Sequence, residues 1–259
     1  MKDIHFAIVA AGMTAVALAS YGVRLIVRGA AQSDRTAKVQ SSVLLGQGLI
    51  EMGYWAITPM ARGCVRLGIT ANGLTWASLC VGVGAGVALA TGQFGLATLL
   101  MMLSTIGDVL DGQVARQTGK SSDVGEVLDA SVDRYTEFAN IGGLVFFYRD
   151  WPVAMLLALG ALLASFMVSY STAKAEALHI PPPRGPMRRH ERGVYMIVGA
   201  FVSCVAGSAI AARWPGMPPA LPQLAALTVI ATIGNYSAIL RFVRTARALR
   251  GRSGSSSHS

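Results

Sequence analysis

Seven apolar stretches, each of about twenty residues, dominate this chain. A helix of roughly 20 residues crosses the hydrocarbon core of a bilayer, where only helices and closed barrels satisfy their own backbone hydrogen bonds. With 53% hydrophobic and only 14% charged residues, the 259-residue chain is too apolar for an ordinary soluble domain. We therefore expect an all-α integral membrane protein, with helices near 5–27, 74–92, 94–114, 124–148, 151–173, 193–212 and 221–241.

Basic residues are distributed unevenly among the connections between these helices. The turns at 91–93, 151–152 and 215–222 are expected on one side of the membrane and carry only Arg149 and Arg213 nearby. Because the other connections contain most of the lysines and arginines, the positive-inside rule makes that second side cytoplasmic and leaves the N-terminus outside. Topology also accounts for the net charge of +9, since the basic residues form no stripe with aromatics that would indicate nucleic-acid binding.

Two segments precede the remaining helices. The stretch after Lys2 has features of a secretory signal, but its apolar character continues to Val27 and basic residues follow, so we expect an anchor, with cleavage as the alternative. Residues 41–66 mix apolar with charged side chains. This mixture predicts an amphipathic helix in the cytoplasmic interface, and a half-buried packing helix is the alternative.

Four aspartates interrupt the apolar pattern. Asp108 and Asp111, three residues apart, share one helix face, and Asp129 and Asp133, four residues apart, share another. If the two helices face each other, the four acids converge and repel one another unless cations are bound. Hard oxygen ligands suit Mg²⁺ or Mn²⁺, and pairs of such ions assist phosphoryl displacement. The acids therefore predict a metal site at the cytoplasmic helix ends.

The residues between the acids favour an anionic ligand. Gly112 lacks a Cβ and allows a ligand to approach the backbone, while Arg116 offers a planar fork for phosphate oxygens. The alternative is that the acids are solvated helix ends, with Asp123 and Glu126 as ordinary negative charges in a first helical turn. That alternative suits either pair alone, but the whole set favours a functional site.

The acids belong to a longer pattern, which reads Asp108-x2-Asp111-Gly112-x2-Ala115-Arg116-x8-Gly125-x3-Asp129-x3-Asp133. It resembles, without a mismatch, the motif of the CDP-alcohol phosphotransferase family of integral membrane enzymes. A weaker match is similar to the segment that enters the family's first core helix, with Ala71 where proline is usual: Gly68-Ile69-Thr70-Ala71-Asn72-x2-Thr75. The resemblance covers roughly residues 60–240.

The resemblance implies a six-helix core, to which this chain adds an N-terminal transmembrane helix and a cytoplasmic interfacial helix. The expected divisions are an N-terminal transmembrane helix at 1–30, a cytoplasmic segment at 31–67, a six-helix catalytic domain at 68–242 and a basic cytoplasmic tail at 243–259. It further implies a homodimer in the cell inner membrane, with the active site facing the cytoplasm.

The resemblance also implies a reaction and the residues that perform it. Two divalent cations, Mg²⁺ or Mn²⁺, would be held by Asp108, Asp111, Asp129 and Asp133. The nucleotide of a CDP-linked substrate would bind to Asp108, Asp111, Gly112, Ala115, Arg116, Asn72 and Thr75. Asp133 would also be the general base, taking the proton of an acceptor hydroxyl that attacks the β-phosphorus and expels CMP. A carboxylate suits this role because it needs to accept the proton only as the new bond forms.

The attacking alcohol is less well defined. The segments around Ser169–Ala177 and Gly185–Arg192 resemble the branch that makes phosphatidylinositol phosphate from CDP-diacylglycerol and inositol phosphate. In that branch the acceptor's phosphate would be bound by residues that correspond here to Ser131, Arg134, Lys174, Arg189 and Arg192. Two features depart from the branch, Arg188 in place of an acid and the prolines at 181–183, and positive-inside topology alone would also place arginines here. Glu137, one turn after Asp133, is placed to orient Arg134 or a metal-bound water, with a simple i, i+3 salt bridge as the alternative.

Three other functions remain open from the sequence. Glycerol 3-phosphate could be the acceptor, or CDP-choline or CDP-ethanolamine could react with diacylglycerol, which needs no cationic acceptor pocket. Acids in membrane helices also mark ion pathways, so a divalent-cation transporter is an alternative of another class. Transporter sites lie near the midplane between repeated halves, whereas these acids cluster at one face and the motif has no second copy.

Overall fold

The structure, a computed structural model, describes residues 2–28, 47–181 and 185–255. Within these ranges the chain forms helices and no strands, as expected. The helices are α1 (Lys2–Arg28), α2 (Gln47–Arg66), α3 (Ala71–Ala90), α4 (Phe94–Gln117), α5 (Asp123–Phe147), α6 (Pro152–Ala177), α7 (Arg189–Arg213) and α8 (Leu221–Ser255). α8 continues without a break through the predicted domain boundary at residue 242.

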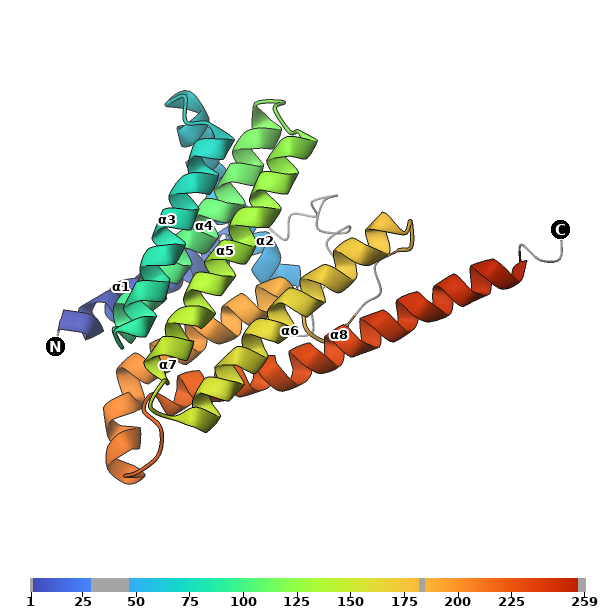
Figure 1. Ribbon diagram of the computed structural model, residues 1–259. Coiled ribbons are helices and arrows are strands. Elements are labelled where there is room, and N and C mark those ends of the chain that lie inside the picture. Colours follow the sequence, from blue (N-terminus) through green and yellow to red (C-terminus); the bar gives the residue numbers. More distant parts are fainter. Residues whose placement is uncertain (1, 29–46, 182–184, 256–259) are drawn as a thin grey trace.

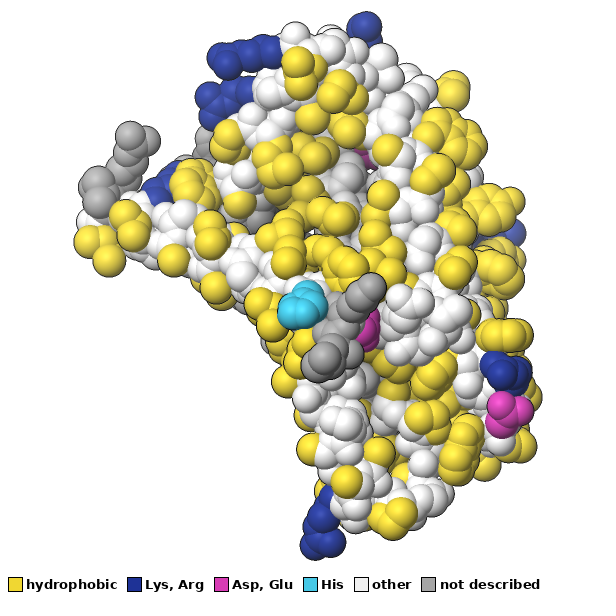
Figure 2. Space-filling model, turned by 90° about the vertical axis from the view of Figure 1, so that its left-hand side faces the viewer, with side chains coloured by type: hydrophobic (Ala, Val, Ile, Leu, Met, Phe, Trp, Pro, Cys, Tyr) yellow, Lys and Arg dark blue, Asp and Glu magenta, His cyan; other side chains and the backbone are white. Residues whose placement is uncertain are grey.

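Six of the helices are long and apolar enough to cross a membrane, namely α1, α3, α4, α6, α7 and α8. α5, the other predicted membrane helix, differs because charged side chains, including Asp133 and Arg134, continue along it as far as Glu137, just past its midpoint. On the face shown in Figure 2 hydrophobic side chains are spread over the whole height of the molecule, interleaved with other side chains and backbone, and Lys and Arg lie at its periphery. Such a surface suits a hydrocarbon solvent, and the all-helical membrane fold is confirmed.

The helices pack in two groups. α3, α4 and α5 stand side by side, and α6, α7 and α8 form a second group inclined to the first (Figure 1). Contacts of α4 with α7 and of α5 with α6 join the groups. α2 lies against α4, where Ile57 and Ala61 pack on Leu110 and Val114. α2 therefore has the buried face of a packing helix, while Met60 on the same helix is exposed.

Three turns meet at one end of the bundle, as the sequence predicted. The ring of Phe147, at the end of α5, packs edge-on against Phe94, at the start of α4, with 5.1 Å between centroids. The Tyr148 hydroxyl donates a hydrogen bond to the Ala220 carbonyl oxygen at 3.0 Å, which joins the α5–α6 turn to the α7–α8 connection.

The N-terminus of α1 is tied to the same end by Asp3. Its carboxylate accepts hydrogen bonds from the backbone N–H groups of Gly95 (2.9 Å) and Leu96 (2.8 Å), and the Cys204 thiol lies 3.6 Å away. These N–H groups belong to the first turn of α4 and have no partner within that helix. Asp3 thus caps α4 from a different helix and joins α1 to the bundle.

Glycines bring α3 and α5 into close contact. A Cβ at Gly143 would overlap the carbonyl oxygen of Gly86, and a Cβ at Gly86 would overlap the carbonyl of Ala139. Helices in membranes associate by such close approach at small residues, because lipid tails provide no hydrophobic drive toward association. The crossing sets the position of α5, and with it the position of the α5 carboxylates.

Gly143→Ala is expected to destabilise the protein, because the new methyl group has no space at this crossing. An overlap of this kind costs about 1–3 kcal/mol, and the melting temperature falls by roughly 2–4 °C per kcal/mol. Gly142→Ala is the matched control, since a Cβ at Gly142 meets nothing within 4 Å. Thermal unfolding in detergent should separate the two variants, and equal melting temperatures would show that the crossing tolerates a methyl group.

Candidate active site

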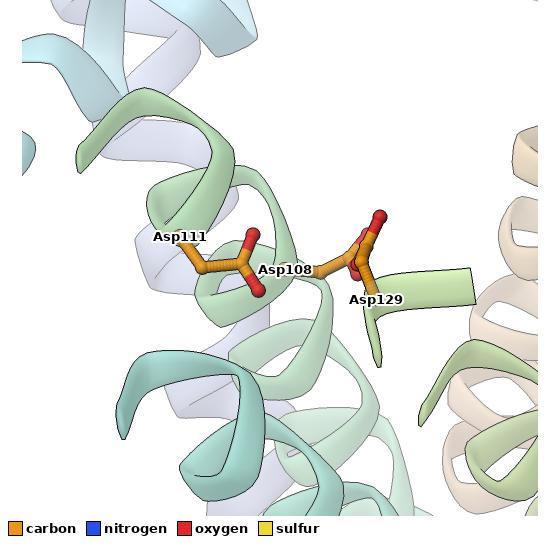
Figure 3. A group of neighbouring side chains, drawn as sticks. All are labelled: Asp108, Asp111 and Asp129. Atoms are coloured by element: carbon orange, nitrogen blue, oxygen red, sulfur yellow. The ribbon is translucent and has the colours of Figure 1, made fainter. Parts of the chain in front are cut away.

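Three of the four predicted metal ligands form one cluster. Asp108 and Asp111 on α4 and Asp129 on α5 each offer a carboxylate oxygen, and these oxygens lie within 4.8 Å of one another. Figure 3 shows the carboxylates of both helices pointing toward a common region. The cluster consists only of hard oxygen donors, and one oxygen of Asp129 is buried without a hydrogen-bond partner among the described residues. Both properties fit a divalent cation.

The loop between α4 and α5 brings these carboxylates together. α4 ends at Gln117, and Gly119 adopts φ +67°, a left-handed conformation that favours glycine. α5 then starts with Ser122 as its N-cap, whose hydroxyl accepts a hydrogen bond from the Gly125 N–H at 3.1 Å. The reversal is short, so the acids near the end of α4 face those near the start of α5.

Thr75 on α3 orients one of the three carboxylates. Its hydroxyl donates a hydrogen bond to Asp111 Oδ2 at 2.6 Å, and the two side chains are both buried. Among the described residues Asp111 has no salt bridge to a basic side chain. An ionised carboxylate in this position requires charge compensation that Thr75 does not supply, which again fits a cation.

A cavity of about 360 Å³ opens beside the cluster, between α3, α4 and the start of α5. Its lining includes six of the seven residues predicted to bind the nucleotide, Asn72, Thr75, Asp111, Gly112, Ala115 and Arg116. The seventh, Asp108, belongs to the acid cluster but does not line the cavity. A Cβ at Gly112 would lie 3.2 Å from the Arg116 guanidinium, so the glycine also leaves room for this arginine.

Asp133 is engaged differently from the other three acids. It forms a salt bridge with Arg189 on α7, and Arg134 lies 3.5 Å from its second oxygen. The same Arg189 nitrogen is 3.4 Å from Asp108. One guanidinium therefore links Asp133 to the edge of the metal-ligand cluster, although Asp133 is not among the three acids whose oxygens gather.

The five residues predicted for the acceptor phosphate are not all brought together. Arg189 and Arg192 line a second cavity, of about 110 Å³, which also includes Asp133. Ser131, Arg134 and Lys174 are not part of its lining. The Ser131 hydroxyl donates to the Val127 carbonyl oxygen on its own helix, and Lys174 is exposed on α6.

Arg192 has a carboxylate partner that the sequence did not reveal. Its Nε and Nη2 donate to the two oxygens of Glu137 at 2.7 and 3.2 Å. The expectation that Glu137 orients or pairs with Arg134 was therefore wrong; Arg134 instead bonds the Ala130 carbonyl oxygen at 2.9 Å. Arg192 is only 2% exposed, so a charge-assisted pair at this depth holds its guanidinium firmly.

Arg241 on α8 was not among the predicted site residues. It is buried, and it donates to the Thr172 hydroxyl at 2.8 Å and to the Met187 carbonyl oxygen at 3.1 Å. These bonds hold the residues just before α7, the helix that carries Arg189 and Arg192. No sequence signal distinguished Arg241 from the neighbouring arginines, because its burial depends on how α6 and α8 pack.

Fold and site together define a class: an integral membrane enzyme whose carboxylates can hold divalent cations between two cavities. Residues 68–246 match the family model of the CDP-alcohol phosphatidyltransferases, and the chain belongs to this family. It is therefore a membrane transferase of phospholipid biosynthesis, and the cation-transporter alternative was wrong.

Relatives with assigned names agree with this placement. The chain is 33% identical over 181 residues to the phosphatidylinositol phosphate synthase of Mycobacterium marinum. The matched residues make up 68% of this chain and 75% of that protein. It is 30% identical over 196 residues to the enzyme of the same name from Streptomyces avermitilis, covering 74% and 78%.

Solved structures show the same fold. The crystal structure of the Mycobacterium tuberculosis phosphatidylinositol phosphate synthase with CDP-diacylglycerol bound superposes with a TM-score of 0.63 and 26% identity, covering 73% of this chain and 92% of that one. A second structure of that enzyme, in complex with manganese and citrate, gives a TM-score of 0.64 at 25% identity, covering 73% and 88%.

Proposed function

We propose that this enzyme transfers the phosphatidyl group of CDP-diacylglycerol to inositol phosphate, which yields phosphatidylinositol phosphate and CMP. The observation that carries the proposal is the position of the carboxylates between two cavities. Asp111 and Asp129 line the larger cavity, and Asp133 lines the smaller one together with Arg189 and Arg192. A nucleotide donor in the first cavity and an anionic acceptor in the second would meet at these acids. The names of the relatives and the CDP-diacylglycerol of the neighbouring structure support the choice of substrates.

Divalent cations fit the donor side of this site. Asp108, Asp111 and Asp129 would hold them, and Asp133 completes the predicted set for two ions, Mg²⁺ or Mn²⁺; the manganese complex of the neighbouring structure supports this choice. When bound, such ions would offset the negative charge of the diphosphate and of the departing CMP. Asn72, Thr75, Gly112, Ala115 and Arg116 would surround the nucleotide in the larger cavity.

Asp133 would be the general base. The acceptor's hydroxyl oxygen bonds to the β-phosphorus, and the proton of that hydroxyl passes to the Asp133 carboxylate. The bond between the β-phosphorus and the oxygen that bridges the two phosphates breaks, and CMP leaves with that oxygen. Asp133 must first leave its salt bridge with Arg189. The acceptor's phosphate is a suitable exchange partner, because a guanidinium binds phosphate oxygens as readily as carboxylate oxygens. Arg189 would thus bind the acceptor and free the base in one step.

The enzyme would lie in the cell inner membrane with its active site facing the cytoplasm. The acid cluster lies at the end of the bundle opposite the three short turns, and the connections there are rich in arginine. The positive-inside rule supports placing this end in the cytoplasm of a cell whose inner membrane holds the protein. Ser131, Arg134 and Lys174 remain predicted contacts of the acceptor phosphate, and a homodimer remains a prediction from the family.

The substrates can be tested with purified protein in lipid nanodiscs. CDP-diacylglycerol and Mg²⁺ or Mn²⁺ are supplied with inositol phosphate, inositol or glycerol 3-phosphate, and CDP-choline with diacylglycerol in a separate reaction. We expect CMP release and phosphatidylinositol phosphate, identified by mass spectrometry, only with inositol phosphate. A lipid product from glycerol 3-phosphate or from diacylglycerol instead would overturn the proposed acceptor.

A further inference from the structure

The smaller cavity extends from Asp133 between α4, α5 and α7, away from the nucleotide cavity. Along this path it is lined by polar side chains from two helices, Ser104 and Thr105 of α4 and Thr136 and Asn140 of α5. These positions lie one or two helical turns from the acids, within segments that otherwise bury apolar side chains. Polar groups inside a membrane bundle are costly unless they are satisfied. The Ser104 and Thr105 hydroxyls donate to the carbonyl oxygens of Ser78 and Met101, both at 2.9 Å, so the need for a partner falls on other lining residues.

Two buried atoms of this cavity's lining residues lack a partner among the described residues. One is Nη1 of Arg192, whose other two guanidinium nitrogens are fixed by Glu137. The other is Oδ1 of Asn140. The first can only donate a hydrogen bond and the second can only accept one. Native proteins rarely leave such atoms unpaired, and both belong to residues that line the same space.

The size and chemistry of the cavity restrict what could satisfy these atoms. A volume of about 110 Å³ corresponds to roughly three or four water molecules, at about 30 Å³ each in the liquid. It is too small for a whole nucleoside, and its lining combines these polar side chains with the apolar side chains of Met101, Ile141, Met196 and Ile197. A hydroxyl group both donates and accepts, so neighbouring hydroxyls of one molecule match a lining that presents a donor and an acceptor.

We propose that this cavity binds hydroxyl groups of the acceptor next to the one that Asp133 deprotonates, with Arg192 Nη1 donating to one and Asn140 Oδ1 accepting from another. Asn140 is then a specificity-determining residue, which selects an acceptor with several adjacent hydroxyls. Glu137 is a positioning residue, because its two hydrogen bonds fix the guanidinium and leave Nη1 for the acceptor. The inference deepens the proposed function and rests on it.

The test combines an enzyme variant with altered substrates. Asn140→Leu preserves the approximate size of the side chain and removes the acceptor oxygen. Its kcat/KM for inositol phosphate should fall about ten- to hundredfold, the penalty for leaving a buried polar group unpaired, while its KM for CDP-diacylglycerol stays unchanged. Asn140→Asp, which keeps an oxygen at this position, should recover part of the loss. Melting temperatures of both variants identify any failure to fold.

Deoxy analogues of inositol phosphate complete the test. The wild-type enzyme should lose activity with the analogue that lacks the hydroxyl bound by Asn140, whereas Asn140→Leu should no longer distinguish that analogue from the parent. Equal kcat/KM of Asn140→Leu and wild type, or equal use of every analogue by the wild type, would overturn the inference and leave the cavity to water. If the proposed function itself is wrong, the result is distinct, because the wild-type enzyme then makes no lipid product from unmodified inositol phosphate.

Discussion

Asp133→Asn is expected to abolish lipid synthesis while the enzyme still binds CDP-diacylglycerol. The amide retains an oxygen that can accept a hydrogen bond from Arg189, so the local structure should persist. It cannot take the proton of the acceptor hydroxyl at neutral pH. Loss of a general base typically slows turnover by about 10²–10⁴-fold. Because Asp133 does not line the nucleotide cavity, donor binding should change little.

Two measurements on the same preparation check this expectation. CMP release reports turnover, and equilibrium binding of CDP-diacylglycerol in nanodiscs reports the donor site. Asp150→Asn is a suitable control, since this carboxylate is 78% exposed and lies in the α5–α6 turn, at the opposite end of the bundle. Turnover within a few fold of wild type in Asp133→Asn would refute the role of Asp133 as base.

Asp111→Asn is expected to weaken divalent-cation binding and to remove activity with it. Asparagine can still accept the hydrogen bond of Thr75, which keeps the side chain in place, but one of three clustered negative charges is lost. Mutations of residues that merely support metal ligands cost 10–100-fold in affinity, so loss of a ligand should cost at least about 100-fold.

Manganese titration followed by electron paramagnetic resonance measures this affinity without relying on turnover. Chelation of metal from the wild type should stop CMP release, and added Mn²⁺ or Mg²⁺ should restore it. In Asp111→Asn, restoration should require a much higher metal concentration. An unchanged Mn²⁺ affinity in this variant would show that Asp111 serves the nucleotide and not a cation.

Local sequence patterns predicted the helices and most of the acid cluster. Hydropathy identified each apolar segment, and the three-residue spacing of Asp108 and Asp111 placed both carboxylates on one face of α4, as the structure confirms. The larger cavity could also be anticipated, because Gly112, Ala115 and Arg116 belong to the same few turns as these acids. All of these inferences depend on neighbours within one helix or one short loop.

The pairing of charges between helices could not be predicted in this way. Asp133 meets Arg189 across 56 residues, and Glu137 meets Arg192 across 55. Both pairs depend on where α7 begins relative to α5, and the hydropathy pattern started α7 four residues late, at residue 193. Helix periodicity favoured a partner for Glu137 on its own helix. Tertiary packing provided a stronger, bidentate partner instead.

The cap that Asp3 provides for α4 implies an order of assembly in the membrane. Asp3 precedes Gly95 by 92 residues and Cys204 by 201. At an elongation rate of about 5–20 residues per second, the ribosome adds these partners roughly 5–20 s and 10–40 s after α1. α1 therefore enters the bilayer before its binding partners exist, and the cap on α4 can form only after the first turn of α4 has been synthesised.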